Sequence, residues 1–110
     1  MSLAKEMTAA KELKFGLTNT ERLNLGVCWD IYTGDEVYEN IADTEETARV
    51  VLLEVAGLRR GEHFTLYVNE PQTICLTAVL KVCADNEISV TLLHYNQETD
   101  RWHEQKWNTR

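Results

Sequence analysis

Two short polar segments carry the side chains best suited to chemistry. Asn69 and Glu70 follow one apolar run, and His94, Tyr95 and Asn96 close a second. A carboxylate beside an imidazole can serve as general base and general acid, which makes Glu70 and His94 the candidate catalytic pair. The candidates for hydrogen bonding to a small ligand are Asn69, Glu70, Tyr95 and Asn96. The alternative is ordinary turn polarity, with Asn69 capping the next helix.

A pair of histidines near the C-terminus makes a metal site the second kind of chemistry to consider. If residues 97–100 form a hairpin loop, His94 lies opposite His103 and Tyr95 lies opposite Trp102. Cross-strand Cβ atoms are ~4.5–5.5 Å apart, which is close enough for two imidazoles to share a metal. Two histidines do not complete a site, and the sequence identifies no third ligand. We therefore expect a solvent-facing or stacked pair, with the metal as the weaker alternative.

The sequence contains none of the common glycine-loop, nucleophile or zinc-binding motifs. A phosphate would therefore have to bind at the helix start after Asn69. The three cysteines, Cys28, Cys75 and Cys83, form no Cys-x-x-Cys pair. Their odd number indicates a reducing compartment and buried thiols rather than a disulfide framework. We expect no cofactor.

The elements that must position the polar segments lie within residues 63–95. Apolar runs at 64–68 and 88–95 predict two strands, and the intervening stretch begins after Pro71 and stops at Asn86, as a helix would. A strand, helix, strand unit implies two parallel strands joined by a crossover. Ligands bind such units at the carboxyl ends of the strands.

Residues 72–84 decide whether that edge exists. Nearly every position is apolar, and the exceptions Thr73, Thr77 and Lys81 are spaced by four, which predicts a helix with one narrow polar stripe. The alternative is a strand at 73–83 followed by a hairpin loop, which would give an antiparallel meander. We expect the helix, whose remaining apolar sides would need a cover such as a second subunit.

The N-terminal half predicts strands and then a helix. Residues 13–18 predict a short edge or bulged strand interrupted by Gly16, and alternation over 23–41 around a turn at 33–36 predicts a β-hairpin. Its buried face would carry five alternating apolar residues: Leu23, Leu25, Val27, Trp29 and Ile31.

A helix should follow the hairpin. Asp43 and Glu46 occupy the two positions of a capping box, so we expect the helix to begin at Asp43. Gly57 or Gly61 could close it in the left-handed conformation. The core-facing stripe would be Ala48, Val51, Leu52 and Val55.

Together these elements predict a single α/β domain over residues 13–110, preceded by a weakly patterned and disordered lead at 1–12. The domain would have a mixed sheet of about five or six strands, an N-terminal hairpin, a βαβ unit, a C-terminal antiparallel hairpin and two helices. The composition, 44% apolar and 26% charged over 110 residues, is that of a globular protein. Its apolar stretches are far shorter than the ~18–20 residues of a membrane span. We expect a cytoplasmic protein with no membrane association.

The net charge of −7 limits the classes of partner. Six carboxylates lie between Asp35 and Glu46 with no lysine or arginine among them. Such a region repels a polyanion, so direct nucleic-acid binding is disfavoured. It is typical of a solvated face with a helix start. The alternative is an anionic surface for a basic partner, as in an acidic inhibitor that mimics nucleic acid.

The last predicted strand supplies candidate interface residues. Trp102 and Trp107 flank polar residues in a terminal strand, which could serve as a template for pairing with another chain. Aromatic packing within the sheet is the alternative. Leu76 and Leu80 are the matching candidates on the apolar helix, and a homodimer is the expected assembly.

The functional expectation is a non-catalytic binding or regulatory module that self-associates. The first alternative is a small enzyme or nucleotide-type ligand binder that uses Asn69, Glu70 and His94. The second is the acidic inhibitor.

Overall fold

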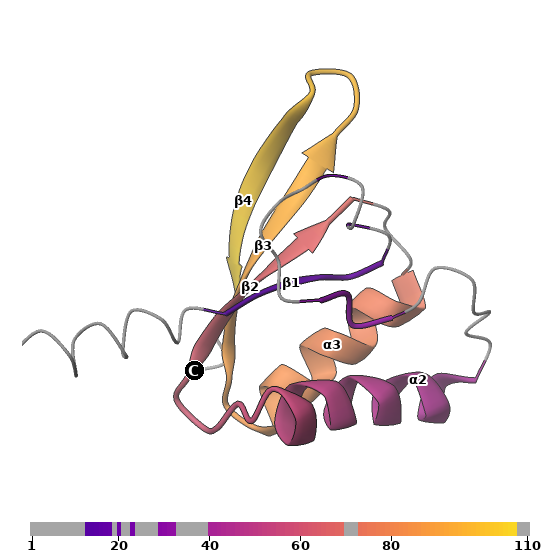
Figure 1. The fold of residues 1–110 in the computed structure, drawn as a ribbon, viewed down its shortest axis with the longest axis vertical. Coiled ribbons are helices and arrows are strands. Elements are labelled where there is room, and N and C mark those ends of the chain that lie inside the picture. The colour runs from indigo at the N-terminus through magenta and orange to yellow at the C-terminus, as the bar shows by residue number, and fades with distance from the viewer. Residues whose placement is uncertain are drawn as a thin grey trace, which may run out of the picture.

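The computed structural model describes residues 13–18, 20, 23, 29–32, 40–69 and 73–107 of the chain. They form one mixed sheet with two helices, as Figure 1 shows, and the α/β class is confirmed. The elements are β1 (Leu13–Gly16), α2 (Ile41–Arg49), the π-helical continuation η2 (Val50–Val55), β2 (His63–Val68), α3 (Thr73–Asp85), β3 (Ser89–Asn96) and β4 (Arg101–Trp107).

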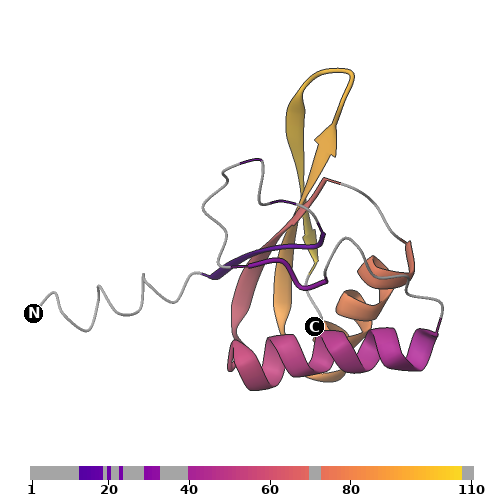
Figure 2. The same cartoon turned by 45° about the vertical axis from the view of Figure 1, so that its right-hand side comes forward.

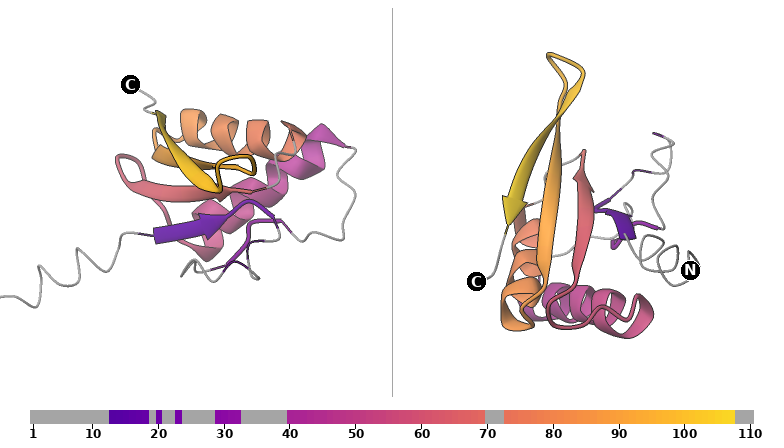
Figure 3. Two further views of the ribbon diagram at one scale, coloured as in Figure 1. Left: turned by 90° about the horizontal axis from the view of Figure 1, so that it is seen from above. Right: turned by 90° about the vertical axis from the view of Figure 1, so that its left-hand side faces the viewer.

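The sheet has the order β1-β2-β3-β4. β1, β2 and β3 run parallel, and β4 is antiparallel to β3. The predicted βαβ unit is therefore confirmed, and so is the predicted helix at 72–84, of which residues 73–84 are described and helical. Parallel crossovers are right-handed, so two that advance in the same direction put both helices on one face of the sheet. The helices pack on each other there (Figures 2 and 3), while the β3–β4 hairpin projects beyond the other strands.

The core lies between the sheet and the helices. Phe64, Leu66 and Val68 alternate along β2 and are buried on the helix side. On α3 the stripe of Thr73, Thr77 and Lys81 is solvent-facing, as the spacing predicted. The opposite side of α3 buries Cys75, Ala78, Val79, Val82 and Cys83.

The N-cap of helix α2 lies three residues earlier than predicted. Asn40, and not Asp43, is the N-cap: its side-chain Oδ1 accepts the backbone N–H of Asp43 at 3.1 Å. An asparagine amide three residues upstream caps the helix as well as a carboxylate would. Ile41, expected at the end of a strand, is therefore helical and 63% exposed.

The core stripe of this helix also ends earlier than predicted. Ala48 and Leu52 are buried, but Val55 is 63% exposed. The turn containing Val55 is π-helical, and the N–H of Ala56 bonds to the carbonyl of Val51, five residues back, at 2.9 Å. A wider turn rotates Val55 off the face that a regular 3.6-residue period would give it.

The predicted N-terminal hairpin falls largely outside the described residues. Of its described residues, Leu23 was expected to be buried but is 43% exposed, and residues 29–32 run parallel to β1 along that strand's free edge. The N–H of Ile31 bonds to the carbonyl of Gly16 at 2.8 Å, and the N–H of Tyr32 bonds to that of Leu17 at 3.1 Å. Trp29 was expected in the core but is 39% exposed, because at this edge it packs one side against Phe15, with ring centroids 5.0 Å apart.

Counted with this edge segment, the described sheet has four strands and a short fifth, in the order 29–32, β1, β2, β3, β4. Numbered along the chain, the order is 2-1-3-4-5. The chain therefore leaves β1 in one direction across the sheet and returns on the other side to form β2. In open α/β sheets such a reversal creates a crevice outside the carboxyl ends of the two strands.

A close approach holds the edge segment and the chain after β1 together. The carboxylate of Asp30 accepts the backbone N–H of Thr20 at 3.1 Å and also accepts the Thr20 hydroxyl. Both side chains lie directly over Gly16, where a Cβ atom would overlap the Thr20 hydroxyl and the Asp30 carboxylate. Glycine is therefore required at position 16 by space.

The assignment of the N-cap is testable. Replacing Asn40 with alanine should lower the free energy of unfolding by about 1 kcal/mol, because one backbone donor of the first turn loses its partner. Asp43→Ala is the matched control and should cost only the helix-dipole contribution, about 0.3–1 kcal/mol. Urea unfolding followed by circular dichroism measures both, and a larger loss in Asp43→Ala would contradict the assignment.

The contact over Gly16 gives a second prediction. Gly16→Ala should destabilise the protein by about 1–3 kcal/mol through overpacking. Gly57→Ala is the comparison, because nothing lies within 4 Å of its added Cβ and only its positive φ of 71° disfavours alanine. This variant should lose about 1 kcal/mol of unfolding free energy. The double variant Gly16→Ala/Thr20→Ser has a smaller side chain at position 20 and should recover part of the lost stability, measured as Tm in thermal unfolding. No recovery would contradict the overlap above Gly16 as the source of the strain.

Candidate functional site

The carboxyl ends of β1 and β2 meet at the strand-order reversal. Gly16 lies opposite Tyr67 in the parallel register, and the N–H of Leu17 bonds to the carbonyl of Tyr67 at 2.9 Å. Continuing this register places Thr18 beside Asn69. Thr18 is the second residue beyond β1 and Asn69 the first beyond β2, so both lie at the strand ends where ligands of open α/β sheets bind.

Thr18 is the most unusual polar residue at this edge. It is 0% exposed, and its Oγ1 has no hydrogen-bond partner among the described residues. A buried hydroxyl left in this state costs about 1–3 kcal/mol. Native structures retain few such groups, and each requires an explanation such as local strain, a bound water or ion, or a functional role.

The neighbouring groups are already engaged with one another. Thr20 is fully buried, and Asp30 is partly buried with its carboxylate turned onto Thr20. The contact between them ties Thr20 to Asp30. This edge is therefore bounded on one side by β1 and residues 29–32.

Both helices begin at this edge. Thr73 opens α3 only four residues after Asn69, and the hydroxyl of Tyr32 donates to the carbonyl of Thr44 in α2 at 2.9 Å. Helix N-termini favour negative charge. The first turn of α2 already contains Asp43, whereas the first turn of α3 carries no acidic residue. Of the two, α3 is better suited to receive an anionic group.

A groove of about 350 Å³ separates the N-terminal halves of the two helices. This volume is within the range of small-molecule pockets. The groove is lined by Ile41, Glu45, Thr73, Ile74, Thr77 and Ala78.

The residues predicted from the sequence do not converge on one site. Asn69 is at the reversal, and Glu70 lies outside the described residues. His94 is opposite Val68 in the register, but its Nε2 is 2.9 Å from Oε1 of Gln105 on β4. A pairing of His94 with Glu70 therefore finds no support in the described geometry.

Tyr95 and Asn96 are engaged in the hairpin. The Tyr95 hydroxyl donates to the carboxylate of Asp100, and this hydrogen bond raises the pKa of the tyrosine. The side-chain oxygen of Asn96 accepts the N–H of Glu98 at 2.9 Å and so stabilises the hairpin loop. These contacts give both side chains a structural role.

The predicted register of the C-terminal hairpin is confirmed: His94 lies opposite His103, and Tyr95 opposite Trp102. The described residues nevertheless contain no group of three or more histidine, cysteine or acidic side chains that could hold a metal. The imidazole of His94 is bonded to Gln105 instead.

The candidate interface residues lie on two faces of the sheet. Trp102 packs between Tyr67 and Tyr95 on the helix-free face, at centroid distances of 5.2 and 5.1 Å. Trp107 lies opposite Val90 on the helix side and is 37% exposed. Leu76 and Leu80 are half-buried on α3. Trp102 is thus engaged in the aromatic packing given above as the alternative.

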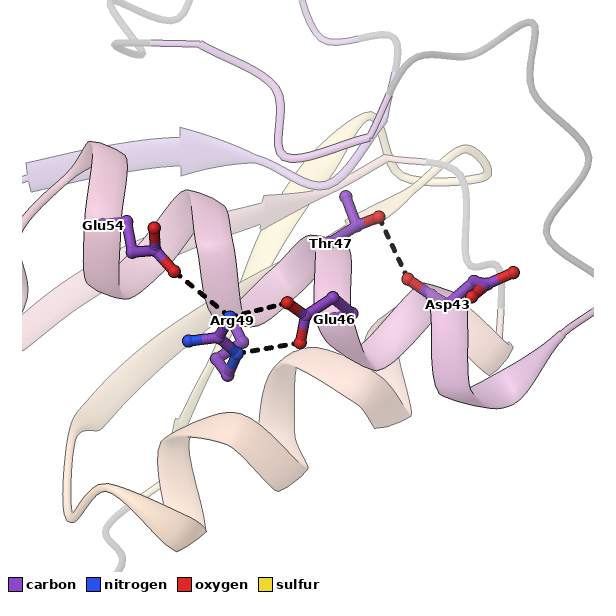
Figure 4. A network of polar contacts seen from close by, with 5 residues as sticks. All are labelled: Asp43, Glu46, Thr47, Arg49 and Glu54. Carbon is purple, nitrogen blue, oxygen red and sulfur yellow. Dashed lines mark hydrogen bonds and ion pairs between the residues drawn. The ribbon is translucent and has the colours of Figure 1, made fainter.

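Figure 4 shows that Arg49 of α2 joins two acidic residues, Glu46 of α2 and Glu54 of η2. Arg49 bonds to Glu46 at 2.6 Å and to Glu54 at 3.1 Å, and the hydrogen bond from Arg49 lowers the pKa of Glu46. Lys81 of α3 lies 4.0 Å from Glu45. Part of the negative charge of this helix is therefore compensated, and Asp35, Glu36 and Glu39 of the predicted acidic region lie outside the described residues.

Burial makes the two described thiols unreactive. Cys75 and Cys83 are both buried, and desolvation raises the pKa of each, that of Cys83 to about 12. A nucleophilic cysteine requires the opposite shift, a lowered pKa.

No helix among the described residues has the length and apolarity needed to cross a bilayer.

Sequence patterns overlooked the residues that build the reversal. The pattern of residues 13–18 indicates only that Gly16 interrupts a strand, and the predicted hairpin gives Asp30 no role. The available signal was a strand ending in Gly16 and followed by Thr18 and Thr20, since glycine at a strand end marks close backbone approach. The pairing with Asp30 has no local signature.

Comparison with known proteins adds no functional information. No protein-family model matches the chain, and neither a curated protein nor a solved structure matches it significantly.

Proposed function

We propose that this chain is a non-catalytic, ligand-sensing module that binds a small polar ligand of nucleotide type at the carboxyl edge between β1 and β2. The buried and unpaired hydroxyl of Thr18 is the observation that carries the proposal. It lies where the strand order reverses, which is the binding position of open α/β folds.

The ligand class follows from the groups at this edge. Hydroxyl and amide side chains, here Thr18 and Asn69, hydrogen-bond to ribose and phosphate oxygens. The N-terminus of α3 offers backbone N–H groups and no competing acid in its first turn. A ligand with hydroxyl groups and one or more phosphates would use both features.

Binding without turnover is supported by the state of the neighbouring groups. The carboxylate of Asp30 accepts hydrogen bonds from Thr20, so it is not a free general base. The imidazole of His94 is directed to Gln105. Among the described residues, these contacts leave the edge with recognition groups and without an activated nucleophile.

The first test concerns stability. Thr18→Val keeps the shape of the side chain and removes the hydroxyl, so it should raise the free energy of unfolding by about 1 kcal/mol. Thr99→Val in the exposed hairpin loop is the matched control and should change stability by less than about 0.5 kcal/mol. Urea unfolding measures both variants. A clear loss of stability in Thr18→Val would mean that the hydroxyl has a structural partner.

The second test concerns binding. Thermal unfolding of the wild-type chain with AMP, ATP and GTP should show a rise in Tm that grows with nucleotide concentration, since a ligand of the native state stabilises it. The more stable Thr18→Val variant should lose this response, whereas Thr99→Val keeps it. Absence of any shift with all three nucleotides, or an equal shift in the two variants, would overturn the proposal.

A further inference from the structure

We infer that β4 is an interface for a second copy of this chain, formed by antiparallel pairing of the two β4 strands about a two-fold axis through Gln105. This joins two sheets into one. The inference is independent of the ligand site, because that site lies at the carboxyl ends of β1 and β2, whereas the proposed interface is the free side of β4.

β4 has the properties of a pairing edge. It is the terminal strand of the described sheet, with β3 on one side only, and it is seven residues long. It contains no proline, and its side chains are exposed except for the half-buried Trp102. An edge of this length with unpaired backbone groups is a template for another strand.

Charge selects the register. A two-fold axis through Gln105 places Glu104 of each copy opposite Lys106 of the other, so the pairing contains two ion pairs. A shift that centres the axis on Glu104 would instead bring two carboxylates together, which is unfavourable for directly opposed residues. The Gln105-centred register is therefore the one in which the charges of this strand are complementary.

The charge of β4 also differs from that of the whole chain. The strand contains Arg101 and Lys106 but only one carboxylate, Glu104, whereas the chain carries a net charge of −7. Two copies repel each other over most orientations of approach. β4 departs from this general repulsion, because its own net charge is only +1 (Arg101 and Lys106 against Glu104) and the Gln105-centred register pairs Glu104 with Lys106.

On the helix side of the joined strands, Trp107 of each copy would be the one apolar residue of β4, beside Arg101, His103 and Gln105. In the continuous sheet the two copies of α3 lie on the same face, separated by about four strand spacings of ~4.8 Å, or roughly 19 Å. A helix with side chains is about 10–12 Å wide, so a gap of one side-chain layer remains. Trp107, exposed by 37%, and the half-buried Leu76 and Leu80 border this gap. Closing it would bury all three.

Analytical ultracentrifugation over a concentration series tests the interface. The wild-type chain should form a dimer, and Lys106→Glu should raise the dimer dissociation constant by about tenfold, because both ion pairs become repulsive. The double reversal Glu104→Lys/Lys106→Glu should restore the dimer. Lys14→Glu reverses an exposed lysine on β1 and is the matched control, with no expected effect.

Cross-linking tests the register separately. Gln105→Cys should form an intermolecular disulfide on mild oxidation, since each new thiol faces its own counterpart, whereas His103→Cys should not. Circular dichroism confirms folding of each variant. A wild-type monomer at every concentration, equal effects of Lys106→Glu and Lys14→Glu, no rescue by the double reversal, or efficient cross-linking through position 103 would each overturn the inference.

Discussion

The crossover of α3 from β2 to β3 forces these strands to run parallel, because a chain that returns over the face of a sheet re-enters it in the same direction. Burial of the apolar side of α3, including Cys75 and Val79, holds that arrangement in place. Every other feature depends on it: carboxyl ends that share one edge, helix N-termini that begin there, and an antiparallel hairpin displaced to the far side of the sheet.

The structure separates two edges with different character. At the carboxyl ends of β1 and β2 lies the unpaired hydroxyl of Thr18, and on the β1 side this region is closed by segment 29–32 and the contact of Asp30 with Thr20. The edge at β4 is open and exposed among the described residues. Recognition of a small molecule and association with another chain would therefore use different parts of one sheet, and mutations at either edge should affect one property alone.

Periodicity predicted the elements that bury a single continuous face. The threonines and lysine spaced by four identified α3, and the four-residue loop identified the pairing of His94 with His103. Prediction from the pattern failed at two places in the α2–η2 helix. At its start, Asn40 is the N-cap in place of Asp43. Near its end, a π-helical turn exposes Val55, which a regular helix would bury. The candidate site was harder to predict because it joins residues of distant segments. The pairing of Thr20 with Asp30 over Gly16 can be predicted only when the parallel register is known.

The side-chain contact between Thr20 and Asp30 has a consequence for sequence variation. It fixes both ends of the intervening connection through groups outside it, so the length of that connection contributes little to the fold. Loop-closure entropy changes by only about 0.6 kcal/mol for each doubling in length. Relatives of this protein should therefore tolerate insertions and deletions between these two positions, while conserving glycine at 16 and the hydroxyl and carboxylate that meet above it.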